Sequence, residues 1–173
     1  MTGSDGHMPP FYTGNYQHLI DSKGRISFPS EWRKIVPGQQ ENYLVTILWP
    51  ERCIGIYPSG EWERIRDRMR SERKYSDTPV LRERHRRILE HTSMATIDQN
   101  GRLTLKNDIR GIAGLEGKVL LLGNLDHVEI WSQERRNEYE QSHDLNEDTL
   151  FLDLSTLVPN GEMGPAGEPG DES

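Results

Sequence analysis

The chain of 173 residues contains an internal repeat, and no other feature of the sequence constrains its fold as strongly. Residues 20–28 read IDSKGRISF and residues 97–105 read IDQNGRLTL, so they match at an offset of 77. The match continues to Arg33 and Arg110. We call the Asp-x-x-Gly-Arg motif of the first copy (residues 21–25) the first box. The second box is the same motif at residues 98–102.

The second half of each copy also matches, at an offset of 74. Residues 45–48 resemble residues 119–122, and residues 54–57 resemble residues 128–131. The first copy therefore has about three more residues, which are placed most simply in the loop 37–42. A unit of roughly 45 residues is too small to bury its own faces, so we expect the two copies to complete each other.

Each copy is predicted to form strand-turn-strand, a short helix and a second strand-turn-strand. Gly24 and Gly101 supply the positive φ of a tight turn. Asp21 and Asp98 can accept hydrogen bonds from the turn backbone. The β-rich runs cover residues 25–28, 43–48 and 53–57 in the first copy, and 102–105, 118–122 and 128–131 in the second.

Two helices are predicted between the copies and one after them. Ser59 is a candidate cap for the first, and Thr78 followed by Pro79 starts the second. Ser132 is expected to cap the third, which runs to about residue 141. The apolar faces of the first two helices are expected to contain Trp62, Ile65, Met69, Leu81, His85, Ile88 and Leu89.

The helical segment between the copies is rich in arginine. We favour a solvated helix surface for this stripe, because acidic residues are interleaved with the arginines. Contacts with phosphates or with acids of a neighbouring subunit remain the alternative. The predicted organisation is a disordered N-terminus (1–10), a first unit (11–58), a helical hairpin (59–92), a second unit (93–131), a C-terminal helix (132–142) and an acidic, largely disordered tail (143–173).

Charge is distributed unevenly along the chain, whose net charge is −7. Ten of the 28 acidic residues and none of the 21 Lys and Arg lie in residues 138–173, so residues 1–137 carry +3. A mildly basic body permits a nucleic-acid partner in spite of the negative total. An apolar patch at residues 150–154 lies within the acidic part, and it can dock on the body or stay mobile.

Nothing in the sequence indicates an enzyme or a metal protein. Cys53 is the only cysteine, so no intrachain disulfide can form. The six histidines show no metal-ligand spacing, and neither a phosphate-binding glycine loop nor a nucleophile elbow is present. We expect no catalysis, cofactor or small-molecule substrate. No apolar run approaches the ~20 residues of a membrane span, and we expect a cytoplasmic protein.

Taken together, these residues resemble the MraZ family of bacterial transcription regulators. The resemblance rests on residues 11–25 (FYTGNYQHLIDSKGR), on residues 86–91 ahead of the second box at 98–102, and on residues 130–131 before the last helix. It covers roughly residues 11–141. The sequence departs from the family pattern at residues 106–107, at Glu90 and in its acidic, glycine-rich tail.

The resemblance implies a β-rich α+β fold. Two SpoVT-AbrB-type swapped-hairpin β-barrel units would be related by a pseudo-two-fold axis, with a helical hairpin between them and a C-terminal helix. It also implies a homo-oligomeric ring that binds double-stranded DNA at repeated boxes in the promoter of the division and cell-wall gene cluster, in association with the nucleoid. The family's use of basic residues in the first box for DNA contact carries over to Lys23 and Arg25.

The box residues also have a structural interpretation. For Asp21, Asp98 and Arg102, and for the turn glycines 24 and 101, we favour a role in locking the turns. Arg25 is balanced between that role and DNA contact, and Lys23 favours DNA contact. The weaker phosphate candidates are Arg33 and Lys34. Two other functions remain open: a ring scaffold that does not bind DNA, and an AbrB-like antitoxin.

Overall fold

The computed structural model describes residues 11–35 and 43–143. The expectations for residues 1–10, for the loop 37–42 and for the tail from residue 144 onward lie outside this part of the chain. The chain divides into two units, Met1–Tyr139 and Glu140–Ser173. Both boxes and all of the strands that surround them belong to the first unit.

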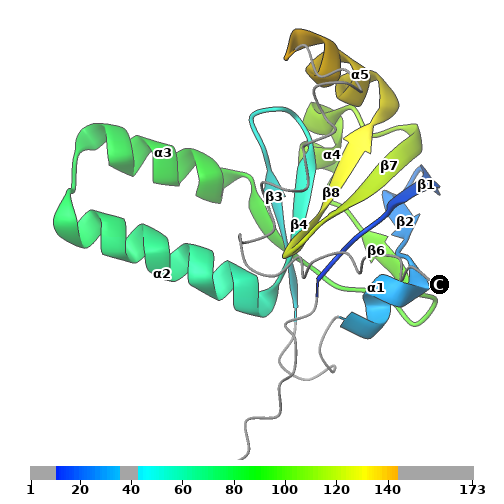
Figure 1. The fold of residues 1–173 in the computed structure, drawn as a ribbon, viewed down its shortest axis with the longest axis horizontal. Coiled ribbons are helices and arrows are strands. Elements are labelled where there is room, and N and C mark those ends of the chain that lie inside the picture. Colours follow the sequence, from blue (N-terminus) through cyan, green and yellow to red (C-terminus); the bar gives the residue numbers. More distant parts are fainter. Residues whose placement is uncertain (1–10, 36–42, 144–173) are drawn as a thin grey trace, which may run out of the picture. The chain divides into compact units, whose positions relative to one another are not determined.

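The described residues follow the predicted order of elements, with a helical hairpin between two copies of a β-rich unit (Figure 1). The first copy contains β1 (Asn15–Ile20), β2 (Arg25–Ser27), α1 (Ser30–Ile35), β3 (Leu44–Leu48) and β4 (Ile54–Pro58). The hairpin consists of α2 (Ser59–Tyr75) and α3 (Pro79–Glu90). The second copy and the final helix are β5 (Thr92–Ala95), β6 (Arg102–Thr104), α4 (Asn107–Ala113), β7 (Gly117–Asn124), β8 (His127–Ser132) and α5 (Gln133–Ser142).

All eight strands of the described residues form one antiparallel sheet in the order β5-β3-β4-β8-β7-β1-β2-β6. The chain that continues from β5 returns to the other end of this order, because Ile97 forms a bridge with Leu103 of β6. The sheet is therefore a nearly closed barrel, and the predicted β-rich α+β class is confirmed.

The two repeats exchange strands instead of folding side by side. β1 of the first copy pairs with β7 of the second, and β5 of the second pairs with β3 of the first. Two pairs join a residue to its own counterpart, Ile26 to Leu103 and Gly55 to Glu129, as a two-fold axis between the copies requires. One cluster of buried side chains accordingly draws on both copies. Neither copy has a complete hydrophobic core of its own, because a unit of this size cannot bury enough apolar surface alone.

The register corrects the expected alignment of β3 with β7. Leu44 pairs with Ala95, and Val119 pairs with His18, which is the counterpart of Ala95. The counterpart of Val119 is therefore Leu44, at an offset of 75, and its expected match with Val45 is wrong by one residue. Leu44 and Val119 both face the shared core, whereas Val45 lies in a different cluster. In a strand, a slip of one residue moves every side chain to the opposite face.

The hairpin α2–α3 covers the outer face of β3 and β4. Trp62, Ile65 and Ile88 pack there against a small cluster formed by Val45, Ile47 and Tyr57. The cap of α3 is as predicted, because the Thr78 side chain accepts a hydrogen bond from Leu81 N at 3.2 Å and Pro79 opens the helix. Figure 1 shows the two helices lying side by side and extending away from the sheet.

Two expectations for this hairpin are wrong. Ser59 is the first residue of α2, and Pro58 occupies the capping position. Leu89, expected on the apolar face of α3, is 47% exposed. His85, by contrast, is buried and paired, since Arg73 Nε donates to its Nδ1 and its Nε2 lies 3.0 Å from Glu72 Oε2.

Helix α5 begins directly after the end of β8 (Figure 1). Ser132 caps it as predicted, with its hydroxyl accepting from Arg135 N at 3.1 Å. Tyr139 packs against the buried Trp131, with ring centroids 5.3 Å apart. None of the helices in the described ranges is both long and apolar enough to cross a membrane.

Candidate nucleic-acid interface at the paired boxes

The first box is a turn built around the carboxylate of Asp21. Its Oδ1 accepts hydrogen bonds from the backbone N–H groups of Lys23 and Arg25, both at 2.9 Å. Its Oδ2 accepts from Arg25 Nε at 2.7 Å. Gly24 has φ +78°, and a Cβ there would lie 2.7 Å from the carbonyl oxygen of Leu105, so only glycine suits this position.

The second box repeats this geometry. Asp98 Oδ1 accepts from the backbone N–H groups of Asn100 and Arg102 at 2.9 Å, and its Oδ2 accepts from Arg102 Nε at 3.0 Å. Gly101 has φ +73°. The bond from the Arg102 backbone is the largest cause that holds the pKa of Asp98 below its usual value, and the corresponding bond from Arg25 does the same for the pKa of Asp21. Both carboxylates are therefore ionised, and each orients one guanidinium.

Each box also receives an arginine from the helix of the other copy. Arg110 of α4 donates from Nη1 to the carbonyl oxygens of Asp21 and Ser22, both at 3.2 Å. Arg33 of α1 lies over the second box, and a Cβ at Gly101 would collide with its guanidinium. The two arginines cross between the copies because β2 pairs with β6. This pairing brings the turn of each box beside the start of the helix in the other copy.

The pairing of β2 with β6 presents the two box arginines on one outward face. Ile26 and Leu103 pair with each other and are buried, so the residues on either side of them point outward. Arg25 lies opposite Thr104, and Arg102 lies opposite Ser27. The Cα atoms of the two arginines are thus about 8 Å apart on geometric grounds. The result is a two-fold pair of oriented guanidiniums.

The boxes differ in charge, although their geometry is the same. Lys23 is exposed in the first box, and the corresponding residue of the second box is Asn100. The side chains of Arg25 and Arg102 are equally exposed, at 32%. Among the contacts of the described residues, Arg25 engages only Nε, so its terminal nitrogens keep donors for a ligand. Lys34 is exposed on α1, in the same helix as Arg33.

Sequence reasoning did not single out Arg110 as a site residue. The available signal was its match to Arg33 in the repeat, but that match does not show that each arginine crosses to the other copy's turn. The described residues contain no group of three or more His, Cys, Asp or Glu side chains that could hold a metal ion. The chemistry that this surface offers is therefore cationic hydrogen bonding from a rigid, two-fold frame.

Comparison with known proteins places this fold in a family. The family model described as "MraZ protein, putative antitoxin-like" matches residues 11–82 and 88–153. A protein of Natranaerobius thermophilus named transcriptional regulator MraZ is 34% identical over 131 residues, which are 75% of this chain and 87% of that protein.

Two further relatives carry the same name. The protein of Tolumonas auensis is 37% identical over 123 residues, covering 70% of this chain and 80% of the relative. That of Serratia proteamaculans is 35% identical over 144 residues, covering 83% of this chain and 90% of the relative. The two ranges that the family model matches include both boxes and the whole of α2, and they leave out residues 83–87 of α3. The chain belongs to the MraZ family.

Proposed function

We propose that this chain is a transcriptional regulator that binds double-stranded DNA through the outward face of its paired boxes. The observation that carries the proposal is the two-fold pair of guanidiniums, each held by its own aspartate within a glycine turn. Holding a guanidinium in advance reduces the side-chain entropy lost on binding. The names of the relatives support the regulatory role.

The candidate residues fall into two groups, those suited to contact a base and those suited to contact a phosphate. Arg25 can present its terminal nitrogens bidentately to guanine O6 and N7, which contributes ~1–3 kcal/mol of discrimination against a wrong base. Lys23 carries a compact charge without a fork geometry and suits a phosphate. Arg33 and Lys34 are weaker phosphate candidates, and Arg33 would act beside the second box because it lies over Gly101.

We further propose that the functional form is a homo-oligomeric ring, acting in the cytoplasm at the nucleoid. One subunit offers few base contacts and a net charge of −7. If a ring presents the boxes repeatedly to repeated promoter sites, linked binding raises the overall affinity by ~10²–10⁴ over a single contact. The resemblance noted in the sequence makes the promoter of the division and cell-wall gene cluster the expected target.

The proposal is tested by a salt-titrated binding assay with DNA from upstream of the chain's own gene and a scrambled control. Specific binding is expected, with a log–log salt slope of about −0.9 for each neutralised phosphate. A well-assembled protein that shows no preference over scrambled DNA at any salt concentration would contradict the proposal. The boxes would then be purely architectural, as in a ring scaffold.

An antitoxin role is a second candidate, which the words "antitoxin-like" in the family description favour. In that case the acidic tail would mask a basic surface of a toxin. A toxin gene beside this one, together with a stable complex of the two purified products, would favour the antitoxin. A cell-wall methyltransferase gene beside it, with repeated boxes upstream, would favour the promoter regulator.

A further inference from the structure

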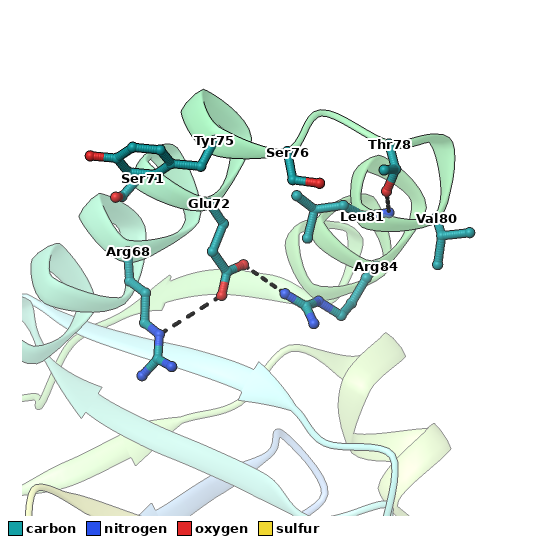
Figure 2. Close-up of a pocket in the computed structure, with 9 residues that line it drawn as sticks. All are labelled: Arg68, Ser71, Glu72, Tyr75, Ser76, Thr78, Val80, Leu81 and Arg84. Atoms are coloured by element: carbon teal, nitrogen blue, oxygen red, sulfur yellow. Dashed lines mark hydrogen bonds and ion pairs between the residues drawn. The ribbon is translucent and has the colours of Figure 1, made fainter.

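The free end of the α2–α3 hairpin contains a pocket of about 640 Å³ that the proposed DNA contact does not use (Figure 2). Tyr75 of α2 and Val80 and Leu81 of α3 form its apolar walls. Tyr75 is 81% exposed and Val80 is 80% exposed. Exposed apolar side chains gathered around a pocket, and ringed by charges, mark an interaction surface.

The charges around this pocket have a positive surplus. Glu72 is approached by three cationic or protonatable groups, with Arg84 Nη2 at 2.6 Å, His85 Nε2 at 3.0 Å and Arg68 Nε at 3.8 Å. Figure 2 shows Arg68 and Arg84 reaching the same carboxylate from the two helices. One carboxylate cannot neutralise two guanidiniums, so a further anion is attracted to this site.

The same sharing recurs along the hairpin. Asp67 serves both Arg66 and Arg70, at 3.7 and 3.5 Å. Glu83 serves both Arg86 and Arg87. Over residues 59–91, ten Lys and Arg face seven Asp and Glu. The complementary partner is therefore acidic, and the apolar walls require that it also carry large apolar side chains.

We propose that this pocket binds residues 144–154 of a second copy of the chain. The sequence of this segment, DLNEDTLFLDL, contains four acids, five large apolar residues and no Lys or Arg. Its apolar residues suit the walls formed by Tyr75, Val80 and Leu81, and Asp153 suits the guanidiniums of Arg68 and Arg84. The segment thus has both properties that the pocket selects.

The topology of the sheet favours a second copy over the same one. β4 and β8 are antiparallel neighbours. Helix α2 leaves the end of β4, whereas α5 leaves the end of β8, so the two helices begin at opposite ends of this strand pair. The pocket lies a further ~14–24 Å along α2, since residues 68–75 follow its start by 9–16 positions. A contact between two different surfaces of successive copies is heterologous, which is the type that closes into rings.

The inference rests on the proposed self-association and is independent of DNA binding. Its test is a photo-crosslink in the full-length protein, without DNA. Tyr75→p-benzoylphenylalanine places a photoreactive group at the wall of the pocket, at an exposed position. Equal amounts of ¹⁵N-labelled and unlabelled copies are mixed, irradiated and digested. Arg136 is the last Lys or Arg of the sequence, so trypsin cuts after it and releases residues 137–173 as a single fragment, which a second protease then narrows to residues 144–154.

We expect cross-links between labelled and unlabelled copies at the frequency of random pairing. Cross-links only between equally labelled fragments would show that the segment of the same copy fills the pocket, and would overturn the inference. Cross-links to another region, or none in an assembled protein, would overturn it as well. Failure of DNA binding with the expected cross-links intact would count against the proposed function alone.

Matched variants identify the contributing side chains. Val80→Ser is expected to reduce the cross-link yield at least tenfold, whereas Leu89→Ser, which changes an exposed apolar residue of α3 outside the pocket, should not. Phe151→Ser should act like Val80→Ser, and Leu157→Ser is its control. Asp153→Lys should lower the yield, and Arg84→Glu in the same chain should restore part of it. Equal yields from Val80→Ser and Leu89→Ser would contradict the assignment.

Discussion

At the scale of single residues, the two aspartates of the boxes organise the candidate interface. Each accepts two backbone N–H groups and one guanidinium, so it forms the turn and orients the arginine at the same time. The structural and DNA-binding interpretations of Arg25 are therefore compatible. Its Nε donates to Asp21, and its terminal nitrogens have no acceptor among the contacts of the described residues. Arg25 and Arg102 have the same geometry, so geometry alone does not show which box contacts DNA. Lys23 distinguishes the first box from the second, because it has no basic counterpart there.

The substitution Arg25→Ala is expected to abolish specific promoter binding near physiological salt while leaving assembly intact. The fork-shaped donor is lost, but the Asp21 bonds to the backbone remain. Binding is measured by the salt-titrated assay and assembly by gel filtration. Arg102→Ala is the matched control, because its geometry is the same, and it should affect promoter binding less. A dissociated Arg25→Ala protein would show that the residue is structural.

The substitution Asp98→Ala is expected to destabilise the fold, because two backbone N–H groups and Arg102 lose their acceptor. The measurement is the melting temperature, which is expected to fall below that of the wild type. Asp98→Asn keeps one acceptor oxygen and should lose less. A melting temperature equal to wild type for Asp98→Ala would refute the role assigned to this turn.

At the scale of elements, the start of β8 holds a cluster of ionisable groups on the outer face of the sheet. Glu129 accepts from Asn124 Nδ2 at 2.9 Å and from Trp131 Nε1 at 2.8 Å, and His127 Nε2 lies 3.5 Å from it. The contact with His127 is the largest cause that lowers the pKa of Glu129 to about 2. Burial acts to lower the pKa of His127, but its contacts with Glu129 and Asp126 outweigh burial, and the net pKa is raised.

These shifts have opposite consequences for stability. A histidine whose pKa is raised in the folded state stabilises the fold below its unfolded pKa of about 6.5, and this contribution is lost as the pH rises through the folded value. A glutamate whose pKa is lowered stabilises the fold above its unfolded pKa of about 4.3, and this contribution is lost as the pH falls toward 2. The cluster therefore stabilises β8 most between the two unfolded pKa values, from about pH 4.3 to about pH 6.5.

The substitution His127→Gln is expected to remove the loss of stability that the wild type shows as the pH rises above about 6.5. The imidazole also stacks on Tyr57, with centroids 4.6 Å apart, so a lower Tm at every pH is expected as well. The measurement is Tm against pH from 6 to 9, with His91→Gln as the control outside the cluster. Parallel curves for His127→Gln and the wild type would contradict the assignment.

At the scale of the whole molecule, the two copies of the repeat fold together as one unit. The core draws on both copies, and the strands β1 and β5 each complete the other copy's part of the sheet. The boxes therefore meet at a two-fold axis inside one chain, and a single subunit presents a symmetric pair of turns. In the proposed ring, each subunit would contribute one such pair, so assembly would multiply the pair and not create it.

Removal of residues 159–173 is expected to leave the mass of the assembly unchanged. This stretch is rich in Gly, Pro and Glu and has too few apolar residues to form a buried interface. The truncation also leaves the proposed docking segment 144–154 in place. Light scattering measures the mass. A smaller assembly after this truncation would show that the extreme tail contributes to the interface.

Local patterns in the sequence determined much of this protein. The twin Asp-x-x-Gly-Arg motifs predicted both turns, because an aspartate that accepts from backbone two and four residues ahead, and a glycine with positive φ, act within five residues. The β-rich runs between turns predicted strands, and the pair Thr78–Pro79 predicted the start of α3. The repeat itself predicted that neither copy would fold alone.

Only the tertiary structure decided how these pieces combine. It placed Arg33 over the second box and Arg110 over the first, set the offset of β3 at 75, and left Leu89 exposed on a helix whose pattern predicted burial. Each of these outcomes depends on which distant strand or helix a segment meets. The choice among strand registers and partners is made by burial of the whole core, so no local window of sequence contains it.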